Sequence, residues 1–533
     1  MTPDVPWDAG AGAAFGADWL LDAIAPVSSF GRRARASERA FRPGDETVAG
    51  EAIARVARAA KAVEPERFEA LHSALAGAPD PGSAIARARS GGILGDADFF
   101  DLSKFLNAHE SVAALARPLG EDVPEFGDVD AALREALATG RTPARAFYLA
   151  DAFDPALAEA RAVAASRQAA YDAARSRLAQ RVAAYVGVER VRDGEFVVMR
   201  ERLIAPVPPE LHVLREAPTY ALCELALDDA ALAALAALEV AVAVVAVAEE
   251  AVRAHLTELV ARAAAPLEAA CDALGALDAL VSRARFAQRF DCVVPQIAVD
   301  CAVAFEDARY LPLVASLEGH SRRYVPISLA LSGVGVVTGP NMGGKSAALR
   351  TLGFVVACVA LGVPVPAVRA SIPLVTEIAW LGIGTTPEDD GLLSAFGSEV
   401  VALRAFLLRD AGRALVLIDE FARTTSPREG RALLVALLET LRQRESFGLA
   451  ATHLTGIASA ANAEHFAIGA LGPLPDNHGE PVELELALDR IAAAMDYRLA
   501  RVAEGAEPVA DAIALAEALG LDRGFVTLAK AAL

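Results

Sequence analysis

The chain has 533 residues, and its 50 lysines and arginines against 70 aspartates and glutamates give a formal net charge of −20. That length allows roughly two to four domains, and a hydrophobic fraction of 54% excludes a disordered chain. The acidic balance argues against a surface covered in positive charge for generic nucleic-acid binding. Five cysteines without a CxxC pair favour reduced thiols in a cytoplasmic protein over disulfides or a metal site.

The first half of the chain predicts a mainly helical region. The first 150 residues are typical of helices broken by Gly/Pro turns. The division into an N-terminal helical segment, 1–84, and a helical core, 85–290, follows from the family resemblance described below. Within that core, two long helical patterns at about 155–186 and 228–263 flank a short β-rich insertion at about 188–227. The chain therefore predicts two long helices that carry a small strand-rich element between them.

The most hydrophobic segment lies at the start of the second long helix. Residues 230–248 are rich in alanine and are interrupted by Glu239. A membrane span needs about 20 apolar residues, so this stretch favours a buried helix and no membrane partner. The N-terminus is acidic and lacks the regions of a signal peptide.

After about residue 291 the pattern changes to short apolar strands that alternate with helices. The runs at 334–337, 415–418 and 448–452 are separated by helical stretches. This alternation is typical of a mostly parallel α/β sheet. We therefore expect residues 291–533 to form an α/β domain behind the helical core.

A phosphate-binding loop is predicted at the start of this domain. Residues 339–346 fit G-x-x-x-x-G-K-[ST] between an apolar strand and a helix, the context that this motif requires. Its backbone N–H groups and the helix N-terminus favour phosphate, Lys345 would reach the β/γ-phosphates of ATP, and Ser346 would ligate Mg²⁺. The predicted nucleotide-binding residues are Gly339, Pro340, Asn341, Met342, Gly343, Gly344, Lys345 and Ser346.

Two later strands end in polar side chains that complete the site. The strand at 415–418 leads into Asp419, which would hold Mg²⁺ through water, and Glu420, which would polarise the attacking water as general base. The strand at 448–452 ends at His453, which suits a γ-phosphate sensor. The predicted catalytic residues are Lys345, Glu420 and His453, and the predicted reaction is hydrolysis of ATP to ADP and phosphate.

The motifs GPNMGGKS, LVLIDE and ATH, in this order, resemble the MutS family of ABC-type ATPases, and the helix–insertion–helix at 155–263 resembles its lever arms. The segment at 389–399 is similar to the family's acidic stretch followed by S-T-F-x-x-E. The resemblance implies that Ser394 acts in trans on the partner's nucleotide, within a homodimer or a MutS-like heterodimer joined through the ATPase domains. A helix N-cap is the structural alternative for Ser394.

The part of the chain before the ATPase motifs differs from the mismatch-reading members of this family. Only about 80 residues precede the helical core, too few for a domain with a Phe-x-Glu wedge, and no nuclease-like extension follows the ATPase region. The insertion is not basic, as its charged residues show: Arg190, Arg192, Arg200, Arg202 and Arg215 against Glu189, Asp193, Glu195, Glu201, Glu210, Glu216 and Glu224. A surface that grips several phosphates needs the opposite sign.

Three hypotheses about the partner follow from these observations. The preferred one is a protein client, because the layout resembles the MutS-like reactivases of adenosylcobalamin-dependent lysine 5,6-aminomutase, including the segments at 26–31 and 495–499. The alternative is a DNA-binding MutS-like protein of mismatch repair or recombination that recognises distorted or branched DNA, which the charge disfavours. A nucleotide-dependent dimer clamp with incidental turnover is the third.

Overall fold

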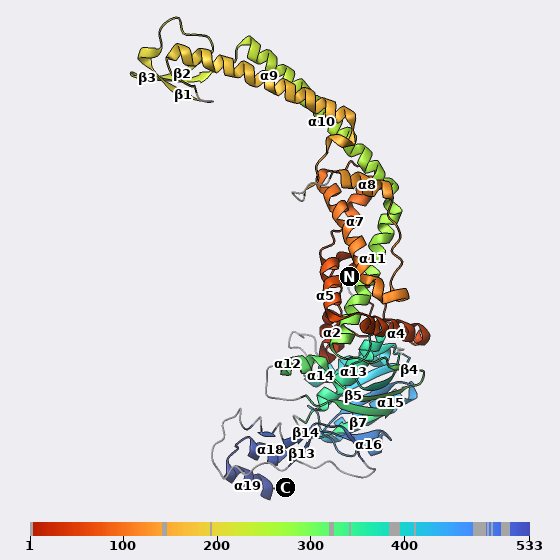
Figure 1. Ribbon diagram of the computed structural model, residues 1–533. Coiled ribbons are helices and arrows are strands. Elements are labelled where there is room, and N and C mark those ends of the chain that lie inside the picture. Colours follow the sequence, from red (N-terminus) through yellow and green to blue (C-terminus); the bar gives the residue numbers. More distant parts are fainter. Residues whose placement is uncertain are drawn as a thin grey trace. The chain divides into compact units, whose positions relative to one another are not determined.

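The computed structural model describes most of the chain and divides it into two compact units (Figure 1). The first unit comprises residues 1–77, 111–125 and 272–533, and the second comprises residues 78–110 and 126–271. The chain crosses between them several times, so the units do not follow the consecutive segments 1–84, 85–290 and 291–533. The functional segmentation stays a prediction. The described residues are 4–140, 146–191, 194–318, 324–340, 343–382, 395–409, 412–472, 487, 490–491, 494–502 and 512–532.

The N-terminal helices are part of the same core as the C-terminal domain. Phe15 and Leu20 are fully buried in one cluster with apolar residues of the helix and strands around the predicted phosphate loop. Two backbone hydrogen bonds tie this segment down further, from Ile378 N to Pro6 O and from Phe41 N to Ala360 O. The elements are α1 (Ala9–Phe15), α2 (Ala17–Ala23), α3 (Ser29–Ala36), α4 (Glu46–Ala62), α5 (Pro65–Ala76) and the 3₁₀ helix η1 (Arg117–Asp122).

The second unit contains a long two-helix arm. Helix α9 (Pro155–Val186) begins with an Asp154 cap and ends at Gly187, whose φ of 65° gives the left-handed C-cap that glycine favours. Helix α10 (Asp229–Arg262) runs beside it (Figure 1). The other helices of this unit are α6 (Gly82–Arg89), α7 (Asp96–Ala116) up to residue 110, α8 (Ala131–Thr139), η2 (Asp151–Phe153) and the first turns of α11 (Ala264–Arg289).

A small antiparallel sheet joins the two helices of the arm at one end. Its strands are β1 (Phe196–Met199), β2 (Leu211–Glu216) and β3 (Tyr220–Leu225), in the order β1-β3-β2, with the 3₁₀ helix η3 (Arg200–Arg202) after β1. Cys223 of β3 and Val182 of α9 share its small buried core. The predicted β-rich insertion between two long helices is therefore present.

The apolar start of α10 is not buried, which corrects the sequence-based expectation. Only 11% of its most apolar 18-residue window is buried, and Val240 and Val247 are 66% and 71% exposed. Among the described helices it alone is long and apolar enough to cross a membrane, by length and composition. Its neighbour α9 carries five arginines over a similar length, and charged side chains are costly inside a bilayer. The pair therefore fits an exposed arm better than a membrane hairpin.

A six-stranded sheet forms the centre of the C-terminal domain, in the order β15-β12-β7-β11-β10-β9. Its strands β12, β7, β11, β10 and β9 are parallel, and β15 is antiparallel. The predicted mostly parallel sheet is therefore present. Its strands are β7 (Val334–Thr338), β9 (Glu377–Gly382), β10 (Ala414–Asp419), β11 (Phe447–Ala451), β12 (Glu464–Ala467) and β15 (Ala500–Arg501).

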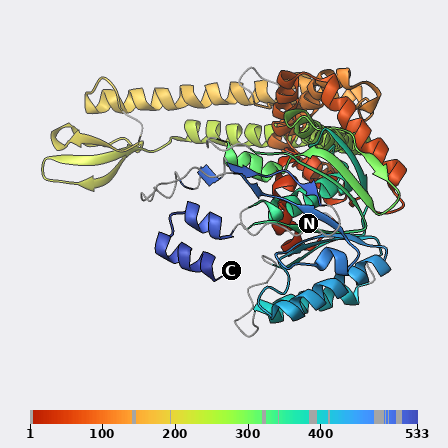
Figure 2. The same cartoon turned by 90° about the horizontal axis from the view of Figure 1, so that it is seen from below.

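Helices cover both faces of this sheet, which explains its continuous apolar strands. Leu415 and Leu417 of β10 belong to the core around α13 (Lys345–Ala360), whereas Val416 and Ile418 belong to the core around α15 (Pro427–Gln443). Figure 2 shows the green and blue strands between the red N-terminal helices and the cyan to blue helices. The parallel strands thus end together at one edge, where the polar motifs follow them.

The remaining elements of the first unit surround this sheet. A second sheet has the order β4-β8-β5-β6, and β13 and β14 form a two-stranded ladder. The elements are β4 (Gln296–Ala298), β5 (Ala302–Ala308), α12 (Leu311–Leu317), β6 (Ile327–Ser332), β8 (Arg369–Pro373), α14 (Ala395–Leu408), α16 (Ile457–Ala460), β13 (Ala470–Leu471), β14 (Met495–Asp496), α18 (Ala512–Ala518) and α19 (Arg523–Ala531).

Candidate nucleotide-binding and hydrolysis site

The phosphate loop connects β7 to α13 through two glycines that no other residue could replace without strain. Gly339 has a φ of 154°, and a Cβ there would lie 2.0 Å from the carbonyl oxygen of Ile468. Gly344, with a φ of 100°, caps the N-terminus of α13. Asn341 and Met342 lie outside the described residues. The described part of the loop has the strand–loop–helix form that the motif predicts.

Lys345 is the first residue of α13, and its side chain is only 6% exposed. The ammonium Nζ donates hydrogen bonds to the carbonyl oxygens of Gly339 (2.9 Å) and Pro340 (3.2 Å). It also lies 3.6 Å from Oε1 of Glu420. Because these two hydrogen bonds of the ammonium go to neutral carbonyl oxygens, a phosphate group can replace them with a stronger, charge-assisted contact.

Ser346 and Asp419 form an oxygen pair beside the lysine. The Ser346 hydroxyl Oγ donates to Oδ1 of Asp419 over 3.1 Å. Burial raises the pKa of Asp419, the neighbouring Glu420 charge raises it further, and the Ser346 hydrogen bond opposes both. A hydroxyl and a carboxylate at this spacing are the hard ligands that Mg²⁺ takes together with water and substrate phosphates. These two residues therefore fit the predicted Mg²⁺ site.

Glu420 follows the last residue of β10 and is held in an unusual backbone conformation. Its φ is 51°, a left-handed value that costs a non-glycine residue about 1–3 kcal/mol. A hydrogen bond from Glu420 N to Ala451 O (2.9 Å) fixes the turn to the neighbouring strand. The carboxylate, 12% exposed, is 3.5 Å from Arg423 Nη1 and 4.0 Å from His453 Nδ1. The turn thus aims the predicted general base at the same place as the lysine.

The structure brings together five residues that the sequence predicts for one site: Lys345, Ser346, Asp419, Glu420 and His453. His453 follows β11, and its side chain is 52% exposed, open to a ligand at the edge of the sheet. The chemical roles of these residues stay predictions. Ser394 lies outside the described residues, so the geometry says nothing of its predicted action in trans.

Two further residues, Glu399 and Tyr497, support the site without having been predicted to do so. Glu399 of α14 accepts a hydrogen bond from Ala422 N (2.7 Å) and thereby fixes the segment after Glu420; burial raises the pKa of Glu399. The Tyr497 ring packs against the phosphate loop, within 3.4 Å of where a Cβ of Gly344 would lie. Both residues lie in segments that resemble the MutS family, and this resemblance was the one sequence feature that could have indicated their supporting roles.

Comparisons with known proteins agree with this geometry. Residues 335–509 match the family model of MutS domain V. The chain is 35% identical over 193 residues to the "Endonuclease MutS2" of Carboxydothermus hydrogenoformans, covering 35% of this chain and 24% of that protein. It is 28% identical over 434 residues to the protein of that name from Symbiobacterium thermophilum, covering 76% of this chain and 51% of that protein.

The matched region coincides with the site. It begins one residue after the start of β7 and includes the phosphate loop, Asp419, Glu420 and His453. The chain spans between about a quarter and a half of the length of the curated relatives it matches. MutS domain V is a P-loop ATPase domain, and the mostly parallel six-stranded sheet of this chain is compatible with that fold class. Residues 335–509 match MutS domain V, and the resemblance of this chain to the MutS family is confirmed.

Proposed function

We propose that this protein hydrolyses ATP at the domain V site and uses the cycle to change how its two-helix arm engages DNA. The observation that carries the ATPase part is the convergence of Lys345, Glu420 and the Ser346–Asp419 pair at one sheet edge. A second copy of the chain, or a related chain, would complete the site through Ser394, as the resemblance to MutS implies.

The described residues supply each part of a hydrolysis site. Lys345 would bind the β/γ-phosphates of the substrate in place of its present loop carbonyls. Ser346 and Asp419 would hold Mg²⁺, which neutralises charge on the phosphates when bound. Glu420 would accept a proton from the attacking water, and His453, beside the Glu420 carboxylate, would contact the γ-phosphate.

Substitution of Glu420 by glutamine tests the hydrolytic assignment. Glu420→Gln removes the base and retains the shape, so we expect ATP to bind while turnover falls roughly a hundredfold or more. Glu439→Gln, a matched loss of a carboxylate on the surface of α15, leaves turnover unchanged. Steady-state phosphate release and equilibrium binding of ATP separate the two effects. Unaltered turnover in Glu420→Gln would remove Glu420 from the mechanism.

Substitution of Lys345 by alanine tests the phosphate loop independently of hydrolysis. Lys345→Ala removes the buried ammonium, so tight binding of ATP is expected to be lost. Normal affinity would contradict the assignment of the loop.

The relatives make DNA the better supported partner. The relatives are named endonucleases, and an endonuclease acts on nucleic acid. No comparison points to a protein client, so the preference for an aminomutase client, which rested on weak resemblances at 26–31 and 495–499, gives way to DNA. Distorted or branched duplex is the substrate class that we propose.

The two helices of the arm carry opposite net charges, which the net charge of the whole chain does not reveal. Helix α9 carries five arginines against two acids, whereas α10 carries two arginines against five acids. Arg167 and Arg177 of α9 are exposed, and in the described chain neither forms an ion pair. The net charge of −20 therefore leaves α9 as a local basic surface suited to phosphates.

A DNA-binding assay with charge variants tests this surface. We expect affinity for branched DNA to fall as salt rises, and the double variant Arg167→Ala/Arg177→Ala to reduce both the affinity and the salt slope, by about one per phosphate contact. Arg262→Ala, an exposed arginine on α10, is the matched control. Equal losses in control and double variant, or affinity independent of salt, would contradict binding along α9.

A protein client remains the second candidate because of one observation on the strand-rich end of the arm. Two of its basic groups are paired within the sheet, Arg200 with Glu216 and His212 with Glu224. An acidic end of this kind suits a basic protein surface better than phosphates. Stimulation of the ATPase by a protein partner, with none by duplex or branched DNA, would favour this candidate.

A further inference from the structure

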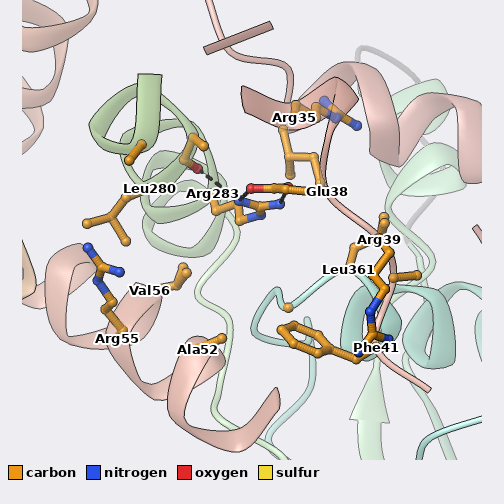
Figure 3. Close-up of a pocket in the computed structure, with 15 residues that line it drawn as sticks. Arg35, Glu38, Arg39, Phe41, Ala52, Arg55, Val56, Leu280, Arg283 and Leu361 are labelled. Carbon is orange, nitrogen blue, oxygen red and sulfur yellow. Dashed lines mark hydrogen bonds and ion pairs between the residues drawn. The ribbon is translucent and has the colours of Figure 1, made fainter. Parts of the chain in front are cut away.

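A cavity lined by several arginines lies in the first unit, and the elements that form it are outside the nucleotide site. It has a volume of about 310 Å³, and it is enclosed by the segment around α3, by α4, by α11 and by the residues that follow α13 (Figure 3). Four arginines and one acid line it: Arg35, Arg39, Arg55, Arg283 and Glu38. Such a concentration of guanidinium groups in one concavity needs a counter-charge.

Two of the four arginines are neutralised by the protein. Arg283 forms a two-pronged ion pair with Glu38, in which Nη1 donates to Oε1 over 3.2 Å. Arg39 binds both carboxylate oxygens of Asp45, at 2.8 and 3.0 Å. These pairs leave no charge to be balanced at Arg39 or Arg283.

The other two arginines hydrogen-bond only to backbone carbonyls. Arg35 Nη1 donates to Leu21 O over 2.8 Å, and Arg55 Nε donates to Asp122 O over 2.8 Å. Within the described residues neither makes an ion pair. Burial and the charge of Arg283 lower the pKa of Arg35, and the nearby carboxylates of Glu38 and Asp22 oppose this shift. The buried Nε of Arg283 also lacks a hydrogen-bond partner among described protein atoms.

The positions of the arginines in the cavity indicate where a ligand would need its negative charges. Figure 3 shows the Arg283–Glu38 pair in the middle, with Arg35 and Arg55 on opposite sides of it. One small anion cannot serve two groups placed in this way, whereas a molecule with an acidic group at each end can. Apolar side chains form the rest of the wall and suit an organic body: Ile24, Phe41, Val56, Leu280 and Leu361.

We propose that this cavity binds a small organic molecule with two separated anionic groups, phosphates or carboxylates, one held by Arg35 and the other by Arg55. The volume is at the lower end of the roughly 300–1,000 Å³ typical of small-molecule pockets. Arginine recognises both kinds of anion through its planar fork.

The ligand would contact the far end of the helix that begins with Lys345. Leu361 and Gly362 line the cavity and directly follow α13. A ligand at one end of this rigid helix and ATP at the other would alter each other's affinity by the same factor. This coupling rests on the proposed ATP site, whereas binding to the cavity does not.

Isothermal titration of the full chain with two probes tests binding directly. Fructose 1,6-bisphosphate represents the phosphates and glutarate the carboxylates, and inorganic phosphate is the single-anion comparison. We expect one of the two-ended probes to bind at least about tenfold more tightly than inorganic phosphate, because it gains a second charge-assisted contact. Absence of binding by both probes up to about 10 mM would overturn the proposal.

Variants assign the binding to the cavity. Arg35→Gln and Arg55→Gln each weaken it about tenfold or more, whereas Arg67→Gln, an exposed arginine outside the cavity, does not. Ala276→Glu places a negative charge at an exposed position of the rim and weakens binding without removing a buried group. This last variant keeps the test valid if either arginine variant fails to fold.

The phosphate loop is excluded by a further variant. Lys345→Ala disables the loop, so binding that survives in this variant belongs to the cavity, and binding that disappears overturns the proposal. In the wild-type chain the bound probe is expected to shift the Kd for ATP severalfold, and this shift is absent in Arg35→Gln. Probe binding with no change in the Kd for ATP would overturn the regulatory role alone.

Discussion

A buried carboxylate anchors the N-terminal segment to α11, and its removal is the most informative perturbation of the fold. Asp278 is 1% exposed and accepts hydrogen bonds from Ser28 N (2.7 Å), Ser28 Oγ (2.5 Å) and Val27 N (3.2 Å). The Ser28 hydroxyl in turn accepts from Gly31 N (3.0 Å) and caps α3. The close approach of the carboxylate requires a glycine at position 31, because a Cβ there would lie 2.4 Å from Asp278 Oδ2.

Asp278→Ala deletes three hydrogen bonds to a charged acceptor and leaves two backbone donors buried without a partner. Bonds to charged groups contribute about 1.5–3 kcal/mol each, and stranded donors add to the loss. Because alanine relieves the burial of a charge, we expect a net decrease of about 3–5 kcal/mol in the free energy of unfolding of the first unit. This is a large part of the stability of a typical domain.

Urea unfolding followed by tryptophan fluorescence measures this effect. The three tryptophans, Trp7, Trp19 and Trp380, all belong to the first unit, so the signal reports the unit that contains Asp278. Asp272→Ala, an exposed aspartate earlier on the same helix, is the control and should change stability by less than about 0.5 kcal/mol. A loss below about 1 kcal/mol in Asp278→Ala would refute the anchoring role.

Two further predictions concern a buried histidine and a strained glycine. Burial lowers the pKa of His109 from its ordinary 6.5, and neither ring nitrogen has a hydrogen-bond partner in the described chain. The contribution of the neutral histidine to the free energy of unfolding is therefore complete above pH 6.5 and is lost as the pH falls toward the lower pKa of the folded state. His109 and His255 lie in the second unit, which contains no tryptophan, so circular dichroism is the signal for its urea unfolding. His109→Phe flattens this pH dependence of urea unfolding, whereas exposed His255→Asn retains it, and an equal slope in both would contradict the burial argument. A Cβ at Gly382, with φ 113°, would lie 2.0 Å from Asp419 O, so Gly382→Ala should reduce kcat at least about tenfold by displacing the predicted Mg²⁺ ligand. Gly412 is also at positive φ, but a Cβ there would make only an ordinary contact with Thr376 at 3.8 Å, so Gly412→Ala should not reduce kcat. Unchanged kcat in Gly382→Ala would show that the strand adapts.

The parts of the fold that were predictable depend on local patterns. The apolar runs at 334–337, 415–418 and 448–452 became β7, β10 and β11, because strands buried on both faces need continuous apolar sequence. Parallel strands end at one edge, so Lys345, Asp419 and His453 could be expected to converge without knowledge of the strand order.

The features that could not be predicted depend on contacts distant in sequence. Asp278 binds Ser28 across 250 residues, and no periodicity in either segment reports such a pair. The exposure of α10 was missed for a related reason. An alanine- and valine-rich helix is expected to be buried, but here α9 provides most of its contacts, α6 and α8 provide fewer, and most of its apolar window stays exposed. Glu399 was missed as a support because its partner is a backbone N–H, which every residue offers.

The separation of charge between α9, at net +3, and α10, at net −3, has a consequence for the rate of association as well as for affinity. An arm that is positive along one edge and negative along the other experiences a torque in the field of a polyanion. A DNA duplex would turn the arm to present α9 before contact, which raises the fraction of encounters that are productive and makes the association rate fall with ionic strength. In the proposed complex with DNA, the acidic helix would then contribute to targeting, because it would repel the duplex from the wrong edge.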